Sequence, residues 1–74
     1  MSSTEDKYNK LIRAIGANLK KARKSKDLSQ ADMTEFGFEL RYYQRLESGT
    51  HSLNLFTLQR LAIIFDCDVS DFLK

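Results

Sequence analysis

At 74 residues, the chain has material for one hydrophobic core, so we expect a single domain over residues 1–74. Its one cysteine excludes an intramolecular disulfide, and its one histidine leaves no cluster of ligands for a metal ion. Residues 1–10 are too polar for a signal peptide, and no apolar run approaches the length of a membrane span. We therefore expect no membrane partner and a cytoplasmic location.

The net charge of +2 conceals an asymmetry along the chain. Residues 1–26 hold eight Lys and Arg against two acids, whereas residues 27–74 hold four against eight. The densest run has five cations in the seven residues from Lys20 to Lys26. A run of this kind is more often a solvated helix face than a binding patch, so it says little about a nucleic-acid partner by itself.

The first predicted helix runs from about Glu5 to Lys24. Apolar residues recur at intervals of three and four, which places them in one stripe on a helix. The stripe comprises Tyr8, Leu11, Ile12, Ile15, Leu19 and Ala22. Ser3 or Thr4 is a suitable N-cap, with acidic residues in the first turn.

A second, short helix is predicted to begin after Ser29. This residue is a good N-cap, and Asp32 three positions later completes a shortened capping box. Met33 and Phe36 would then face the core. Gly37 ends the helix, because glycine adopts a positive φ at little cost.

The third and later helices follow at short intervals. The third is expected near Glu39 to Ser48, where Tyr43 and Leu46 form the buried pair and Gly49 is the C-cap.

Asn54 is the expected N-cap of a fourth helix from Leu55 to about Asp66, and Ser70 of a last short turn, Asp71-Phe72-Leu73. The core stripe of the fourth helix comprises Leu58, Leu61, Ala62 and Phe65. We also expect almost all of the phenylalanines to be core residues: Phe36, Phe38, Phe56, Phe65 and Phe72. The chain is therefore predicted to be all-α, with five helices and no sheet.

The third predicted helix has a polar face of the kind that reads DNA bases. Arg41, Gln44, Arg45 and Ser48 lie together, opposite the buried pair. Arginine can bind guanine O6 and N7 in a bidentate manner, and glutamine can do the same with adenine N6 and N7. Two short helices that meet across a turn with a glycine are also typical of a helix-turn-helix. The pattern favours binding in the major groove.

Several motifs extend this interpretation to most of the chain. They are Leu28-Ser29-Gln30, Gly37, Tyr43-Gln44-Arg45-Leu46-Glu47-Ser48-Gly49 and Thr57-Leu58-Gln59-Arg60-Leu61-Ala62. With these motifs, the sequence from about Ile15 to Leu73 resembles the Cro/C1-type (Xre-family) helix-turn-helix domains, found in phage repressors and in restriction–modification controller proteins. The resemblance implies a five-helix lambda-repressor-like fold, with the helix-turn-helix at about residues 29–48. It also implies binding to double-stranded operator DNA, usually as a homodimer.

The resemblance also implies roles for individual residues. Gln30 would touch a backbone phosphate and steady the recognition helix, while Arg23 and Glu47 would form a buried ion pair. Base edges or nearby phosphates would be met by Leu40, Arg41, Gln44 and Arg45. Further candidate DNA contacts are Ser29, Tyr42, Thr50, His51 and Ser52.

Several of these assignments leave alternatives. Tyr42 is either a phosphate contact or a packing residue, and His51 is either an exposed loop residue or a phosphate contact. Glu39 is either an acid that satisfies the helix dipole or an acceptor for cytosine N4. The corner between the second and third helices is also one residue shorter than in the family.

The chain has more apolar surface than one small core requires, which favours dimerisation. The candidate dimer residues are Ile63, Ile64, Phe65, Phe72 and Leu73. The competing hypothesis is a protein-interaction module, antitoxin-like or adaptor-like, with the same fold. No catalytic constellation is visible, so we expect neither enzymatic activity nor a cofactor or small-molecule ligand.

Overall fold

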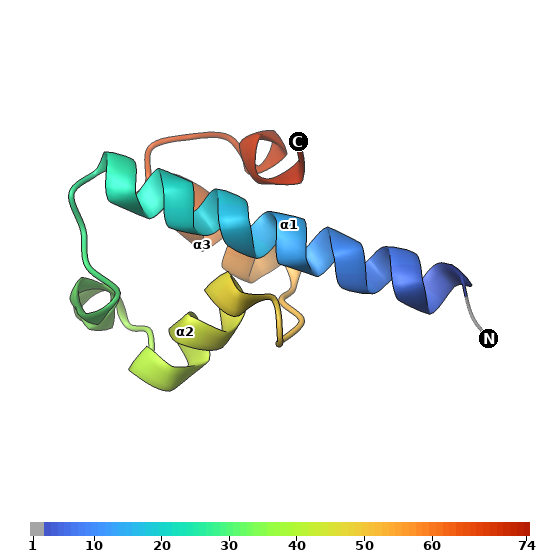
Figure 1. The fold of residues 1–74 in the computed structure, drawn as a ribbon. Coiled ribbons are helices and arrows are strands. Elements are labelled where there is room, and N and C mark those ends of the chain that lie inside the picture. Colours follow the sequence, from blue (N-terminus) through green and yellow to red (C-terminus); the bar gives the residue numbers. More distant parts are fainter. Residues whose placement is uncertain (1–2) are drawn as a thin grey trace.

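The computed structural model describes residues 3–74, which form five helical segments and contain no strand (Figure 1). The segments are α1 (Ser3–Ser25), the 3₁₀ helix η1 (Ala31–Phe36), α2 (Leu40–Ser48), α3 (Leu55–Ile64) and the 3₁₀ helix η2 (Val69–Leu73). The predicted all-α class is confirmed. Two of the segments are 3₁₀ helices, however, so the number of α-helices within residues 3–74 is three.

The long helix α1 crosses the whole molecule, and α2 packs on one side of it and η2 on the other (Figure 1). Burial begins at Ile12 and continues through Leu19. The predicted stripe is therefore wrong at its start, because Tyr8 and Leu11 are exposed. The hydroxyl of Tyr8 nevertheless donates to Ser52 Oγ in the loop after α2.

Gly16 allows α1 and α2 to approach closely. A Cβ atom at this position would lie only 2.6 Å from the carbonyl oxygen of Leu46 in α2. No larger residue fits without moving one helix, so this glycine fixes the distance between α1 and the helix with the candidate base-reading face.

The turn into η1 forms as predicted. The backbone N–H of Asp32 donates to Ser29 Oγ at 3.0 Å, and the N–H of Ser29 donates to Asp32 Oδ2 at 2.7 Å. Met33 is fully buried, and the segment ends at Gly37 with φ +90°. The expectation for Phe36 is wrong, since its side chain is 42% exposed. Phe38 takes the core position instead, and Phe36 lies at the rim of a surface hollow beside α3.

Helices α2 and α3 begin at side-chain caps. Glu39 Oε1 accepts from the N–H of Tyr42 at 2.9 Å, which makes Glu39 the N-cap of α2. Gly49 ends α2 with φ +73°, and a Cβ there would lie 2.6 Å from Arg13 Cα. Asn54 caps α3 as predicted, through a bond of 2.8 Å from the N–H of Thr57.

The C-terminal turn begins earlier than predicted. Asp68, and not Ser70, is the N-cap of η2, because Asp68 and Asp71 form a reciprocal capping box. In one of the two bonds of this capping box, the N–H of Asp68 donates to Asp71 Oδ2 at 3.0 Å. Helix α3 likewise ends at Ile64, two residues short of the expected end at Asp66.

The core lies between α1, α2, α3 and η2. It comprises Ile15, Leu19, Met33, Phe38, Tyr43, Leu46, Leu58, Leu61, Ala62, Phe65 and Phe72. Phe56 does not join them, contrary to expectation, and is 73% exposed on the outer side of α3. Phe65 and Phe72 pack edge to face, with ring centroids 6.4 Å apart, and are almost fully buried. They are therefore not available as a dimer surface, contrary to expectation. Within residues 3–74, no helix is long and apolar enough to cross a membrane.

Candidate nucleic-acid interface

Helix α2 separates its side chains into a buried and an exposed face. Tyr43, Leu46 and Glu47 point into the molecule. The exposed face carries Leu40, Arg41, Gln44, Arg45 and Ser48. The structure thus brings the candidate base-reading residues together on one side of one helix.

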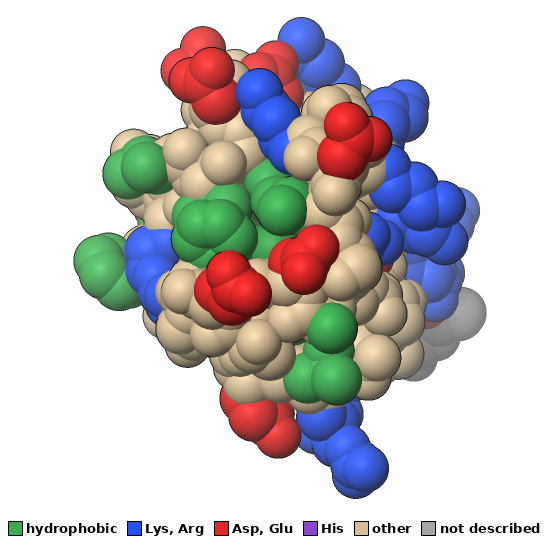
Figure 2. Space-filling model, turned by 90° about the vertical axis from the view of Figure 1, so that its left-hand side faces the viewer, with side chains coloured by type: hydrophobic (Ala, Val, Ile, Leu, Met, Phe, Trp, Pro, Cys, Tyr) green, Lys and Arg blue, Asp and Glu red, His purple; other side chains and the backbone are tan. Residues whose placement is uncertain are grey.

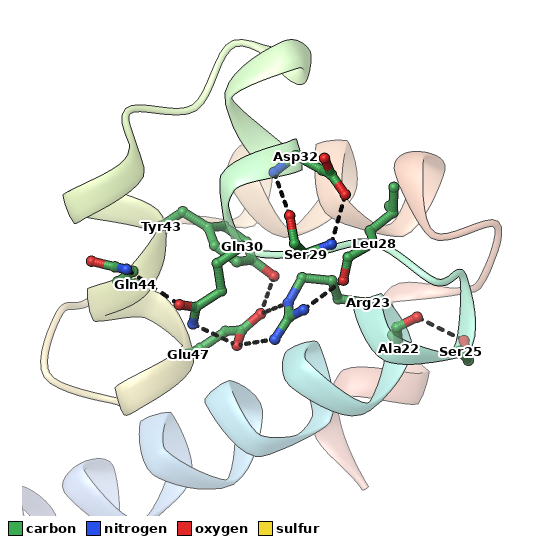
Figure 3. Close-up of polar contacts among 10 residues, drawn as sticks. All are labelled: Ala22, Arg23, Ser25, Leu28, Ser29, Gln30, Asp32, Tyr43, Gln44 and Glu47. Atoms are coloured by element: carbon green, nitrogen blue, oxygen red, sulfur yellow. Dashed lines mark hydrogen bonds and ion pairs between the residues drawn. The ribbon is translucent and has the colours of Figure 1, made fainter.

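A buried ion pair locks α2 to the end of α1 (Figure 3). Arg23 donates from Nε to Glu47 Oε2 at 2.6 Å and from Nη2 to Glu47 Oε1 at 3.1 Å. Its remaining nitrogen donates to the carbonyl oxygen of Leu28 at 2.6 Å, which ties in the turn before η1. Because the two side chains are only 7% and 3% exposed, the pair is shielded from water.

Tyr43 is a third member of this cluster. Its hydroxyl donates to Glu47 Oε2 at 2.5 Å from within the same helix. Burial would raise the pKa of Glu47, but hydrogen bonds from Arg23, Tyr43 and Gln30 outweigh it and lower that pKa. Burial and the bond to Glu47 raise the pKa of Tyr43, so its hydroxyl stays protonated and remains a donor. Glu47 is therefore an ionised acceptor held by three partners.

Gln30 connects this buried cluster to the exposed face of α2 (Figure 3). Its Nε2 donates to Glu47 Oε1 at 3.0 Å, and its Oε1 accepts from Gln44 Nε2 at 3.3 Å. A continuous set of hydrogen bonds thus runs from Arg23 in the interior to Gln44 on the surface.

The other candidate contacts surround this face without joining the network. Tyr42 is half-buried, stacks on Phe38 with centroids 6.4 Å apart, and meets the ring of His51 edge to face at 5.2 Å. These contacts favour the packing role for Tyr42 and leave His51 as an exposed loop residue in contact with it. Thr50 and Ser52 are also exposed in the loop after α2. Ser29 uses its hydroxyl as a helix cap.

A family model described as helix-turn-helix matches residues 19–72, which is most of the chain. The chain belongs to the Cro/C1-type helix-turn-helix family. It is therefore a DNA-binding regulator of the helix-turn-helix type. Comparisons with curated proteins and with solved structures find no match.

Besides the bonds of Gln30 to Glu47 and Gln44, sequence reasoning missed two features of this helix-turn-helix domain. The first is the bond from Tyr43 to Glu47, although their spacing of four residues on a helix could have indicated it. The second is Arg60 of α3, whose guanidinium donates to the carbonyl oxygen of Phe36 at 2.9 Å and lies 4.3 Å from the ring centroid of Phe38. Arg60 thereby joins α3 to the turn between η1 and α2, and nothing in its sequence neighbourhood marks that role.

The end of the molecule that carries η1 exposes hydrophobic side chains, unlike the polar face of α2. Hydrophobic side chains gather in the middle of this surface, with acidic groups close by and basic groups along one edge (Figure 2). A shallow hollow beside η1 is lined by Phe36, Arg60, Ile63 and Ile64. Apolar surface is thus exposed away from the candidate base-reading residues.

Proposed function

We propose that this domain is a sequence-specific transcriptional regulator that binds a pseudo-palindromic operator as a homodimer. The observation that carries the proposal is the exposed face of α2, where Arg41, Gln44 and Arg45 project from a helix held by a buried ion pair. These side chains have the hydrogen-bonding groups that major-groove readout requires. In a dimer, two such helices would occupy successive major grooves, about 34 Å apart.

The decisive experiment compares two double variants that remove the same charge. Arg41→Ala/Arg45→Ala removes cations from the proposed reading face, whereas Lys20→Ala/Lys21→Ala removes exposed cations from α1. A bidentate arginine contributes about 1–3 kcal/mol to base discrimination, so the first variant should lose at least tenfold in affinity for a site selected from random duplex DNA. The lysine variant should retain most of its affinity. Equal losses in the two variants would mean that binding depends only on net charge.

The acidic balance of residues 27–74 supports binding with few phosphate contacts per monomer. The salt dependence of affinity reports the number of phosphates that a protein neutralises. We expect a shallower dependence than that of a strongly basic repressor, measured by fluorescence anisotropy over a range of salt concentrations. A steep dependence would contradict this interpretation of the charges.

For the dimer, we propose a surface around Ile63, Ile64 and Leu73. Ile63 is 69% and Leu73 50% exposed, and Ile64, next to Ile63 in sequence, is half-buried. Ile63→Glu should convert the dimer to a monomer in sedimentation experiments. Leu55→Glu, at an equally exposed apolar position on the same helix, is the matched control and should leave the dimer intact.

A protein-interaction module is the second candidate function. It is favoured by the apolar hollow of Phe36, Ile63 and Ile64, which the base-reading face does not use. If the wild type and Arg41→Ala/Arg45→Ala bind duplex DNA equally poorly, this alternative replaces the operator-binding proposal.

A further inference from the structure

We propose that Arg60 of α3 is a positioning residue for the first turn of α2, because it fixes the corner from which Arg41 reaches a base. The inference rests on the proposed operator binding and gives a role in readout to a residue of another helix. It implies that Arg60 supports the DNA contact of Arg41, and not that of Arg45 near the other end of α2.

The two ends of α2 are held in different ways. Near the C-terminal end, Glu47 is buried and paired with Arg23. In the first turn no side chain is fully buried, since Leu40 and Arg41 are exposed and Tyr42 is half-buried. The placement of Arg41 therefore depends on the corner that precedes the helix.

The corner between η1 and α2, residues 37–39, is held by Arg60 at two points. Arg60 Nη2 donates to the carbonyl oxygen of Phe36, the last residue of η1, at 2.9 Å. A carbonyl at the end of a helix has no partner within that helix, so this bond satisfies it. The guanidinium also lies 4.3 Å from the ring centroid of Phe38, where a cation is attracted to the aromatic face. Arg60 thus contacts the chain on both sides of Gly37.

Arg60 is itself anchored by the core. Its neighbours Leu58, Leu61 and Ala62 in α3 are buried. A Cβ atom at Gly37 would lie only 3.3 Å from Arg60 Nη2, so the guanidinium lies close against the backbone of the corner. Through these contacts the corner is tied to α3.

Phe38 links the corner to the first turn of α2. Its ring stacks on that of Tyr42, with centroids 6.4 Å apart and planes inclined by 9°. Tyr42 directly follows Arg41 in the chain. Removal of Arg60 therefore loosens the turn that carries Arg41, whereas Arg45 lies in the part of α2 that the buried ion pair holds.

The experiment is a pair of double-variant cycles on DNA binding. The operator is selected from random duplex DNA with the wild type, and affinities are measured by fluorescence anisotropy. Arg60→Met keeps an apolar side chain but removes both contacts with the corner, and it is combined with Arg41→Ala or with Arg45→Ala. Gln59→Met, at the exposed neighbouring position of α3, is the matched control.

In the wild-type background, we expect Arg41→Ala and Arg45→Ala each to weaken binding about tenfold. In the Arg60→Met background, the loss from Arg41→Ala should shrink to about threefold or less, and the loss from Arg45→Ala should stay near tenfold. Both losses should stay near tenfold with Gln59→Met. The missing charge of Arg60 lowers affinity for all duplexes alike and cancels in these ratios.

Amide hydrogen exchange without DNA separates positioning from a general loss of stability. In Arg60→Met, the amides of Tyr42 and Tyr43 should exchange about two- to fivefold faster, while those of Leu46 and Glu47 keep their rates. Arg60→Lys can again place a cation over Phe38, so it should recover part of both the protection and the Arg41 penalty.

The outcomes distinguish the inference from the function beneath it. If Arg41→Ala costs the same in the wild-type and Arg60→Met backgrounds, or costs nothing in either, the inference is wrong while operator binding stands. It is also wrong if the Arg45→Ala penalty shrinks by the same factor, or if exchange rises uniformly along α2, because Arg60 would then only stabilise the fold. A wild type that binds all duplexes equally would overturn the proposed function, and this inference with it.

Discussion

Removing Arg23 is the sharpest test of what holds α1 and α2 together. Arg23→Met keeps much of the side-chain volume but leaves the buried carboxylate of Glu47 without its cation. Two of the four hydrogen bonds to that carboxylate disappear, and the carbonyl oxygen of Leu28 loses its donor. Breaking one side of a buried pair costs about 3–5 kcal/mol. For 74 residues the free energy of unfolding is about 4–11 kcal/mol, so the variant should be marginally stable or unfolded.

Urea unfolding followed by circular dichroism measures this loss. Lys24→Met is the matched control, since it removes a cation from the exposed neighbouring position of the same helix and should change the free energy of unfolding by less than about 0.5 kcal/mol. A loss below about 1 kcal/mol in Arg23→Met would refute the reasoning, because the buried carboxylate would then be solvated in some other way. Replacing both partners, in Arg23→Met/Glu47→Leu, should recover only part of the loss, because no unpaired charge remains but the buried hydroxyl of Tyr43 loses its acceptor.

Three further perturbations test the pH dependence and the local geometry. Because the folded-state pKa of Glu47 is lowered, its stabilisation is complete above the unfolded pKa of about 4.3 and is lost as the pH falls through the folded pKa. Glu47→Gln should therefore show a smaller loss of stability on acidification than the wild type, and parallel curves would contradict this. Gly16→Ala should lower the free energy of unfolding by about 1–3 kcal/mol or more in urea titrations, because its Cβ meets the carbonyl of Leu46; an unchanged midpoint would show that α1 and α2 can separate freely. Ser29→Ala should cost about 1 kcal/mol through loss of the cap to Asp32, and Ser25→Ala serves as the comparison.

The sequence predicted the helical class and most helix ends, because caps depend on local chemistry. Gly49 and Asn54 act within a few residues of their own position, so their roles follow from residue type and spacing. The N-cap role of Glu39 was not predicted, because glutamate is not among the usual N-cap residues. Ser70 failed as a cap because the neighbouring Asp68 can make a reciprocal bond with Asp71. When two cap residues compete two positions apart, spacing alone does not choose between them.

Burial of aromatic side chains was harder to predict. Hydrophobicity indicates that exposing Phe36 or Phe56 is unfavourable, but not which segment of the chain is available to cover it. The same limit applies to the candidate site. The face of Arg41, Gln44 and Arg45 follows from helical periodicity alone. The bond between Gln30 and Gln44 depends on how η1 crosses α2, which no local pattern encodes.

The uneven covering of α1 divides one continuous helix into two parts of different local stability. All side chains of residues 3–11 are exposed, whereas Ile12 begins the run that packs against the rest of the molecule. Amide hydrogens in the first part are protected mainly by helix–coil equilibria, and those beyond Ile12 by the folding of the whole domain. Fraying from the N-terminal end can therefore proceed as far as Tyr8, whose hydroxyl donates to Ser52 in the loop after α2, without disturbing Arg23, Glu47 or the face of α2. The opening of the first turn of α1 and the order of α2 are thermodynamically separate events.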